Sequence, residues 1–412
     1  MTITPEAKTS SATPLLNSDR ARNLLLESEL DGIVTATLEN SFYLSGVWNF
    51  GQELFPYNAE SYVVANVDDV AAGTVITSVG EADIALAANT TLKGILTYGA
   101  FSRVAPDGVS LTADEERIKA ITLDAKPAAN ALDALAAALE QQGLVGGSVG
   151  IDERGANRSL IDALTARLPG TRFTPAAELL RRIRMVKTPE EHTRLIHTLR
   201  ITEAAFEATI AAAYAGVTER ELKRVFETAI VVAGARPAFA LIRFGRGMAL
   251  GQVEPGDTTL APGDYIWFDI GCTYRGYRSD IGRVVSFGDP SKRLRDLYKA
   301  SRQGQDRAFE TMLPGTEARA VFAAAVERVR ESGIPHYERH HVGHGIGVEF
   351  YDAPVLAPSV DTPLEEGMVF EVETPYYELG FGGTFIEDTV IIRPDGPEIV
   401  TRLSRDLRVI EP

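Results

Sequence analysis

The sequence has very little cysteine, with Cys272 as the one thiol among 412 residues, so no disulfide can form within the chain. Proteins without disulfides are typical of reducing compartments, which predicts a cytoplasmic location. No uninterrupted apolar run approaches the ~20 residues that a membrane-spanning helix needs, so no membrane association is expected. Residues 1–18 also lack the charged and then apolar pattern of a signal peptide, and we expect them to form a disordered lead-in.

Positive charge is also scarce in this chain. It has 41 Lys and Arg against 57 Asp and Glu, which gives a net charge of −16, and no basic stretch offsets it. Because such a protein repels a phosphate backbone, we expect no nucleic-acid partner. The first half of the chain contains no phosphate-binding glycine loop, dinucleotide fingerprint or other recognisable catalytic motif.

What is present divides the sequence into two parts with different patterns. Residues 19–180 alternate amphipathic helical segments with short apolar runs, which predicts an α/β domain. In residues 181–412, strands and helices are grouped in blocks, which predicts an α+β domain with an antiparallel sheet. The second part begins with a clear helix start, in which Thr188 is the N-cap, Pro189 the first helical residue and Glu191 the capping-box glutamate. Its long helices are expected over 190–215, 219–232, 292–312 and 317–332.

Acidic residues in apolar surroundings are the most informative feature of the second part. Asp269 lies in WFDIG, Asp280 in RSDIGR, Glu373 in FEVETP and Glu387 in FIEDT, while His344 lies between glycines in GHGIG. A buried carboxylate is costly unless it is paired, hydrogen-bonded or bound to a metal. Any one of these residues alone could simply end a strand or form an ion pair. The five together predict a metal site.

The spacing of the acidic residues predicts that they share one face. Asp269 and Asp280 lie symmetrically about residues 274–275, and Glu373 and Glu387 do so about the first glycine in ELGFGG. Directly opposed residues of an antiparallel pair point to the same face, with Cβ atoms about 4.5–5.5 Å apart, so these carboxylates repel unless a cation lies between them. Oxygen ligands with one imidazole suit Mn, Fe, Co or Zn. We expect two divalent ions about 3.5–4 Å apart, with manganese favoured.

Several segments together resemble the pita-bread metallopeptidases, a family that includes Xaa-Pro dipeptidase, aminopeptidase P, methionine aminopeptidase and creatinase. The matching segments are GDYIWFDIG, GYRSDIGRV, HHVGHGIG, LEEGMVFEVETPYY and GGTFIEDTVII, in the order of the family. The earlier DGIVTATLENSFYLSGV is similar to the opening of the creatinase-type N-terminal domain. The resemblance implies an α+β pita-bread C-terminal catalytic domain, an α/β creatinase-type N-terminal domain and a homodimer.

The resemblance also implies roles for the five residues. Asp269 would bind one metal ion, and Asp280 and Glu387 would bridge it to a second. His344 and Glu373 would complete the ligands of the second ion, and Glu373 would also shuttle a proton. A hydroxide held by both ions would attack an amide carbonyl that the ions polarise, without a covalent intermediate.

The residues expected to contact a peptide depart from the family pattern at three places. Relatives carry a second histidine seven positions after the metal-binding one, where this chain has Tyr351. They carry another histidine where our alignment places Gln252, and prolidases often have an arginine where this chain has Phe385. His340 does match a family histidine near the substrate. We therefore expect His340 and Tyr351 to act in catalysis, since a tyrosine hydroxyl can donate a hydrogen bond to an oxyanion.

The departures favour a pocket that is more apolar and aromatic than that of a prolidase. Its expected walls include Tyr376 and Phe385, with Tyr377 and Phe381 nearby. Arg243 is the candidate for a cation on another wall. The alternative is that these are neutral changes around an ordinary dipeptidase site, and that each aromatic residue belongs to the core.

Three functions stay open at this point. The preferred one is a dinuclear metal-dependent hydrolase of an amide or peptide C–N bond, similar to Xaa-Pro peptidases, acting on a small molecule or short peptide. The second is non-peptide chemistry on the same scaffold, such as opening of a cyclic amidine, creatine-like hydrolysis or a lyase reaction. The third is a binding module without catalysis, which the complete ligand set disfavours because such a module need not retain it.

Overall fold

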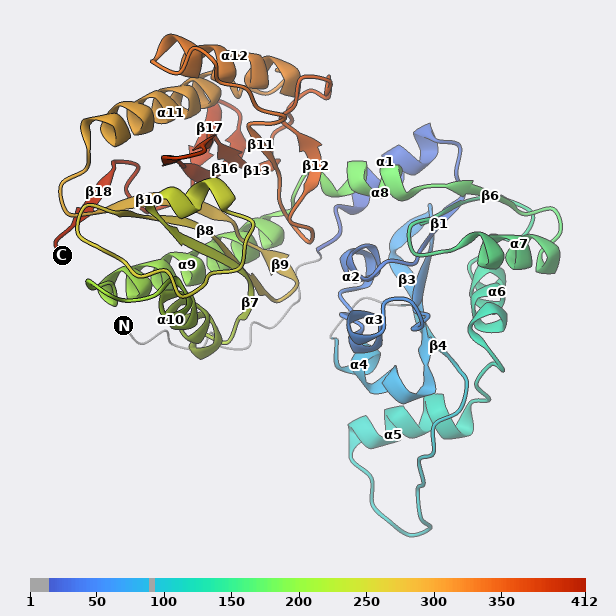
Figure 1. Ribbon diagram of the computed structural model, residues 1–412. Coiled ribbons are helices and arrows are strands. Elements are labelled where there is room, and N and C mark those ends of the chain that lie inside the picture. The colour runs from blue at the N-terminus through green and yellow to red at the C-terminus, as the bar shows by residue number, and fades with distance from the viewer. Residues whose placement is uncertain (1–14, 89–92) are drawn as a thin grey trace. The chain divides into compact units, whose positions relative to one another are not determined.

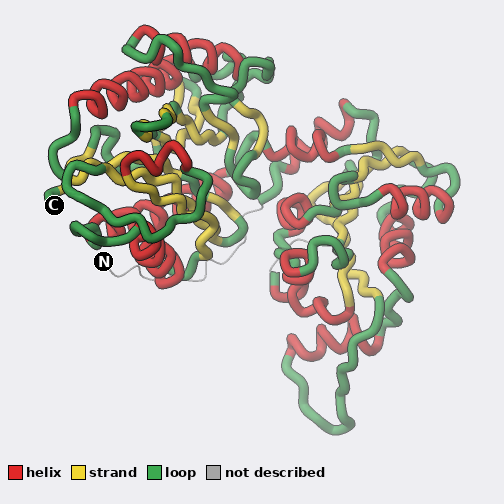
Figure 2. The backbone as a smooth tube through the Cα atoms, in the orientation of Figure 1, coloured by secondary structure: helices red, strands yellow, loops and turns green. Residues whose placement is uncertain are grey.

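The computed structural model describes residues 15–88 and 93–412 (Figure 1 and Figure 2). The chain divides between Arg184 and Met185 into two compact units, which we call the N-terminal and the C-terminal unit. The boundary predicted at residue 180 falls inside helix α8 (Ala177–Arg184), whose apolar side packs in the core of the N-terminal unit. Within the described ranges, no helix is long and apolar enough to cross a bilayer.

The predicted lead-in over residues 1–18 falls mostly outside the described part of the chain, which begins at Leu15. Leu15 and Leu16 are buried, and Leu16 belongs to a core cluster of the N-terminal unit. Asn17 then caps helix α1 (Ser18–Glu27) with its side chain. The end of the expected lead-in is therefore packed against the domain rather than disordered.

The N-terminal unit is built on one mixed sheet, whose strands are β1 (Gly32–Thr35), β2 (Tyr62–Asn66), β3 (Asp69–Ser78), β4 (Gly94–Tyr98), β5 (Ser148–Ile151) and β6 (Arg172–Pro175). Their order across the sheet is β4-β3-β2-β1-β5-β6. Ile33 and Val34 of β1 point into different core clusters, so both faces of the sheet are covered by apolar side chains. The prediction of an α/β domain is confirmed. Its other helices are α2 (Leu38–Ser45), α3 (Phe50–Leu54), α4 (Ala82–Ala87), α5 (Ala113–Lys119), α6 (Ala131–Gln141) and α7 (Arg158–Arg167).

The long helices of the C-terminal unit are α9 (Pro189–Ala211), α10 (Glu219–Val232), α11 (Lys292–Thr311) and α12 (Ala318–Glu331). Thr188 and Glu191 form a capping box at the start of α9, as the sequence predicts, and Thr218 and Glu221 form another at α10. All four helices lie where they are expected. Helix α9 ends earlier than predicted, at Ala211.

Two sheets make up the rest of the C-terminal unit. The first contains β7 (Arg236–Phe244), β8 (Tyr265–Tyr274), β9 (Tyr277–Arg278), β10 (Ile281–Phe287) and β18 (Arg408–Ile410). The second contains β11 (Gly343–Gly345), β12 (Asp352–Val355), β13 (Val369–Glu373), β16 (Glu387–Arg393) and β17 (Gly396–Ile399). Between β13 and β16 the chain forms a hairpin of β14 (Tyr376–Glu378) and β15 (Gly382–Thr384). Almost all pairings are antiparallel, which confirms the α+β prediction.

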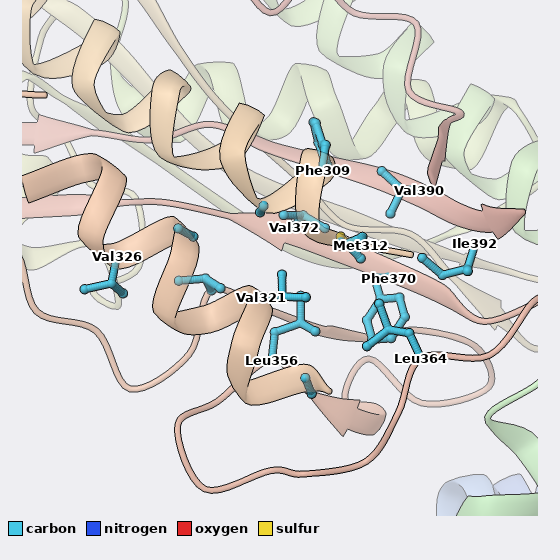
Figure 3. Packing of buried hydrophobic residues seen from close by; sticks show 14 of the residues in the cluster. Phe309, Met312, Val321, Val326, Leu356, Leu364, Phe370, Val372, Val390 and Ile392 are labelled. Atoms are coloured by element: carbon cyan, nitrogen blue, oxygen red, sulfur yellow. The ribbon is translucent and has the colours of Figure 1, made fainter. Parts of the chain in front are cut away.

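Each sheet of the C-terminal unit has one face covered by helices. Helices α9 and α10 lie along the first sheet, and α11 and α12 along the second (Figure 1). Figure 3 shows the second contact, where Phe370 and Val372 of β13 pack with Val390 of β16 against Phe309 and Val321 from the helices. Because side chains alternate along a strand, the residues between these apolar positions must point to the opposite face.

The opposite faces of the two sheets carry the acidic residues. On β13, Glu371 and Glu373 alternate with the apolar residues that face the helices. On β8, Phe268 contacts Phe206 of α9 at 4.9 Å between ring centroids, so Asp269 lies on the other face. Strands β10 and β16 lie side by side and bring the two sheets together. The candidate site is therefore enclosed between the sheets, within the C-terminal unit.

Candidate metal centre

The glutamate pair of the candidate site lies in the predicted register. Glu373 at the end of β13 is directly opposite Glu387 at the start of β16. The β14–β15 hairpin continues the same register and turns at Gly380, whose φ of 89° is readily adopted only by glycine. The prediction that the spacing of these two glutamates makes them face each other is confirmed.

The aspartate pair lies in a different register from the predicted one. Asp269 of β8 is directly opposite Gly282 of β10, and Asp280 precedes β10 on the same face. The turn is centred on Arg275 and Gly276, with φ of 47° and 84°, rather than on residues 274–275. Two consecutive residues with positive φ are typical of the tight hairpin turn that matches strand twist. Asp280 lies two residues before Gly282, the residue opposite Asp269, so the two aspartates still point to the same face. They are diagonal neighbours rather than directly opposed ones.

His344 is held by both neighbours of its strand. It lies on β11, opposite Glu371 of β13 and Val355 of β12. The Nδ1 atom is 3.0 Å from the carbonyl oxygen of Gly345, so Nδ1 carries the proton and Nε2 is left with a lone pair. Burial lowers the pKa of His344 to about 4, which keeps the ring neutral. A neutral imidazole oriented through its second nitrogen is the form that binds a metal ion.

Asp280, His344 and Glu387 form the centre of the site. Each offers a ligand atom, and these atoms all lie within 4.8 Å of one another among buried side chains. Oδ1 of Asp280 and Oε2 of Glu387 are buried without a hydrogen-bond partner. Burial raises the pKa of both carboxyl groups well above the usual range, the charge of Asp269 raises that of Asp280 further, and the charge of Asp280 raises that of Glu387 further. Unpartnered buried oxygens beside a neutral imidazole fit a divalent metal ion.

Asp269 and Glu373 lie beside this centre. Burial raises the pKa of Asp269, and the charge of Glu373 raises it further. The charges of Asp269 and Glu373 also raise the pKa of Asp280. The structure therefore brings together all five residues that the sequence singled out.

Two neighbours of Glu373 were missed by the sequence analysis. Nη2 of Arg339 is 3.3 Å from Oε1 of Glu373, and Nδ1 of His341 is 3.1 Å from the same oxygen. Burial lowers the pKa of His341 to about 3, so this ring is neutral. The one signal for these residues is their position in ERHHVGH, directly before His344, where an Arg and a His read as part of a solvated loop.

Tyr351 lies at the candidate site, as predicted. Its ring stacks on His344, with 3.8 Å between centroids and 16° between planes. Its hydroxyl is 3.4 Å from Nε2 of His341, and the residue is 49% exposed. His340 is exposed, and its ring contacts His341 at 4.3 Å between centroids. The catalytic roles of Tyr351 and His340 stay predictions.

Phe385 does not line an open pocket, which corrects the prediction. It is 1% exposed and packs against Trp267 at 5.9 Å between ring centroids. A Cβ atom added to Gly282 would lie 2.4 Å from the Phe385 ring, so this ring fills the space above the residue opposite Asp269. Phe385 is thus a buried wall beside the metal centre. It belongs to a core cluster with Tyr265, Val284 and Tyr298, among others.

The other two predicted substrate residues are held elsewhere by polar contacts. Arg243 is buried, and its Nε is 3.1 Å from Oε1 of Glu219, while Nη1 donates to the carbonyl of Val253. Its charge is therefore used in a structural ion pair. The hydroxyl of Tyr376 contacts His336 and Glu378, and these three residues line a surface groove with Lys292 and Arg293. Gln252 is exposed.

Comparison with known proteins gives matches over both units. Residues 194–394 match the metallopeptidase family M24, and residues 18–186 match the creatinase/prolidase N-terminal domain. The Xaa-Pro dipeptidase of Lactobacillus helveticus is 31% identical over 251 residues, which are 60% of this chain and 68% of that protein. The Xaa-Pro dipeptidase of Pyrococcus furiosus is 33% identical over 237 residues, which are 57% of this chain and 68% of that protein.

A solved structure matches nearly the whole length of the chain. The Xaa-Pro dipeptidase from Bacillus anthracis superimposes with a TM-score of 0.77 at 25% identity. The match covers 95% of this chain and 99% of that one. It therefore includes both the sheet of the N-terminal unit and the paired sheets around the candidate metal centre.

Proposed function

This chain belongs to the metallopeptidase family M24, and from that premise we propose that it hydrolyses the C–N bond of Xaa-Pro dipeptides at a dinuclear metal centre. Family membership confirms the predicted pita-bread fold with its creatinase-type N-terminal domain, and the class of metal-dependent hydrolase. The substrate, the number of ions and the roles of single residues are our proposal. The binding-module alternative loses support, because the similar sequences are Xaa-Pro dipeptidases and all five expected ligand residues are present.

The observation that carries the proposal is the buried group of Asp280, His344 and Glu387, in which two carboxylate oxygens have no hydrogen-bond partner. Asp269 would hold one ion, Asp280 and Glu387 would be shared, and the remaining ligands would hold the second. When bound, the ions would lower the pKa of a water shared between them and polarise the substrate carbonyl. Their ligands come from strands of both sheets, so the fold fixes the ligand positions before any ion arrives.

The surrounding side chains would position the reacting groups. Glu373 has His341 on one oxygen and is placed to accept a proton and return it to the leaving amine. Tyr351 stacks on His344 and holds that ring in its orientation, and its hydroxyl, beside His341, would donate to a developing oxyanion. The buried ring of Phe385 excludes water from the side of Asp269.

The metal content of purified protein tests the proposal. We expect about two divalent ions per chain by mass spectrometry after loading with Mn, as a two-metal site requires, and metal-dependent cleavage of a panel of Xaa-Pro dipeptides. Asp280→Ala should lose both ions and activity. Asp395→Ala makes the same substitution at an exposed site and should lose neither. A metal-loaded wild type that cleaves no member of the panel would refute the peptidase proposal.

One observation keeps a second candidate function open. Tyr351 stands where relatives have a histidine, and apolar Phe385 stands where prolidases often have an arginine. Both differences suit hydrolysis of a small cyclic amide or amidine in place of a peptide. Adding such compounds to the panel separates the two functions, since both depend on the same ions and only the preferred substrate differs.

We also infer manganese as the resident ion, a homodimer and a cytoplasmic location. Manganese follows from the oxygen-rich ligand set with one imidazole. The homodimer follows from the resemblance to the family. The location follows from the single cysteine. Metal analysis of protein from cells tests the inference of manganese, and sedimentation of the purified protein tests the homodimer.

A further inference from the structure

We propose that Arg339 binds the carboxylate of the substrate and so selects substrates with a free C-terminal carboxyl group. The inference rests on the proposed peptidase function, because it concerns the same site. Arg339 lies in the segment before β11, directly beside the metal centre. Its Nη2 is 3.3 Å from Oε1 of Glu373, and its side chain is 13% exposed.

The hydrogen-bonding capacity of Arg339 is largely unused. A guanidinium offers several N–H donors in a planar fork. Glu373 is the one acceptor within hydrogen-bond distance among the described residues, and Nε is buried without a partner. The guanidinium lies over the ring of Tyr377, with 5.9 Å between its central carbon and the ring centroid. That ring holds the fork in place from one side but accepts no hydrogen bond in its plane.

Metal loading would weaken the one acceptor of Arg339. Glu373 is one of the five proposed ligands, and a lone pair given to an ion would no longer be available to the arginine. Two divalent cations would also offset the negative charge that Arg339 faces in their absence. A mostly buried guanidinium without an anionic partner is costly. The loaded site therefore favours an added anion at Arg339.

A dipeptide places its carboxylate at the required distance from the cleaved bond. The carbon of the cleaved carbonyl and the carbon of the carboxylate are three bonds apart, about 3–4 Å with standard bond lengths. A carbonyl held over the ligand carboxylates thus has its carboxylate within reach of a side chain that already touches Glu373. The planar fork of arginine suits two parallel hydrogen bonds to that group.

Two other buried arginines already have carboxylate partners. Arg243 is paired with Glu219, and Arg283 is paired with Asp388 on the helix-facing side of β16. Phe385, at the position where prolidases often carry an arginine, is apolar and buried. Arg339 reaches the centre from a different segment of the chain. It supplies the cation that the sequence comparison found missing.

Paired substrates test this inference on metal-loaded, full-length protein. We expect the wild type to prefer an Xaa-Pro dipeptide with a free carboxylate over the same dipeptide with a C-terminal amide. Arg339→Met should raise KM for the free acid by about 10- to 100-fold, the range for hydrogen bonds to a charged group, and leave kcat/KM for the amide within about twofold. Arg339→Lys should have a KM for the free acid between those of the wild type and Arg339→Met. Arg293→Met removes a positive charge at an exposed position and should leave KM and kcat for both substrates unchanged.

Two results would overturn the inference. Equal losses on both substrates, or a loss of bound metal in Arg339→Met, would mean that Arg339 only positions Glu373. If the wild type cleaves neither substrate, the peptidase proposal fails, and binding of a reduced-bond dipeptide analogue decides the question of Arg339. Calorimetry should then show tighter binding of the acid than of the amide in the wild type and no difference in Arg339→Met. Equal affinities in the wild type would refute the carboxylate site by itself.

Discussion

Phe385 occupies the position at which prolidases often carry an arginine, and in this chain that position belongs to the core. Its ring is 1% exposed and packs on Trp267 above Gly282. An arginine in place of Phe385 is therefore not expected to reach the carboxylate of a substrate. A cation at this position would be buried among apolar side chains, although the acidic centre is close by.

We predict that Phe385→Arg destabilises the protein by about 3 kcal/mol or more, because it removes a packed ring and buries a charge. Phe385→Leu, which keeps the position apolar, should cost about 1–2 kcal/mol. Urea unfolding of both variants measures the difference. A stable Phe385→Arg protein with raised activity on free-acid dipeptides would mean that this position faces the substrate after all.

Residue types and spacing were enough to find the acidic residues that the structure brings together, because a carboxylate in an apolar strand is costly without a cation. They were not enough for Arg339 and His341. Both lie in an irregular segment, where no periodicity tells which way a side chain points. The same limit applies to Arg243, whose partner Glu219 lies on another element and is revealed only by the folded chain.

At the scale of elements, the two ligand hairpins differ in how well the sequence predicts them. Glu373 and Glu387 follow a regular register through a glycine turn, so symmetry about that glycine finds the pair. The hairpin of β8 and β10 turns one residue later than symmetry suggests, because Arg275 adopts positive φ beside Gly276. A non-glycine residue with positive φ is uncommon, and nothing in its sequence announces it.

The capping box of α9 gives a pH-dependent contribution to stability. Oε1 of Glu191 accepts the hydroxyl of Tyr277 at 3.0 Å, Oε2 accepts the N–H of Thr188, and burial raises the pKa of Glu191 to about 7. An acid with a raised pKa in the folded state binds its proton more tightly there than in the unfolded chain. Its contribution to stability is therefore present below the unfolded value of about 4.3 and is lost as the pH rises toward 7.

We predict that Glu191→Gln flattens this dependence. The unfolding free energy of the wild type should fall relative to the variant by up to about 1.4 kcal/mol per pH unit between pH 5 and 7. Glu221→Gln is the matched control, since Glu221 completes the same motif at α10 but is exposed, and its hydrogen bonds to Thr218 lower its pKa. Urea unfolding at several pH values would contradict the prediction if both variants showed the slope of the wild type.

At the scale of the whole molecule, the order of helical and strand-like segments along the sequence was enough to distinguish the α/β unit from the α+β unit. Strand and helix periods are local properties, and their order along the chain indicates the class of fold. The boundary between the units was placed too early, at residue 180 inside α8 rather than after Arg184. In the structure, Leu180 and Ile183 of that helix pack in the core of the N-terminal unit.

All five proposed ligands lie in the C-terminal unit, which predicts how metal affects the two units. In calorimetry of the full chain, Mn at 100 times its dissociation constant should stabilise one unit by about 2.7 kcal/mol for each ion bound. For a unit of this size, each ion corresponds to a rise of about 5–10 °C in one transition, with the other unchanged. Asp280→Ala should abolish the shift and so identify the transition. Equal shifts of both transitions would show that the units unfold together.

The position of the ligands on two different sheets has a consequence for a chain with a single thiol. Asp280 and Glu387 are about 100 residues apart in the sequence; Asp280 directly precedes β10 of one sheet, and Glu387 begins β16 of the other. An ion bound to both would close that long stretch into a ring in the folded protein, as a disulfide would. The catalytic ion would thus also be the molecule's cross-link. Unlike a sulfur bridge, it forms in a reducing compartment and is removed by a chelator.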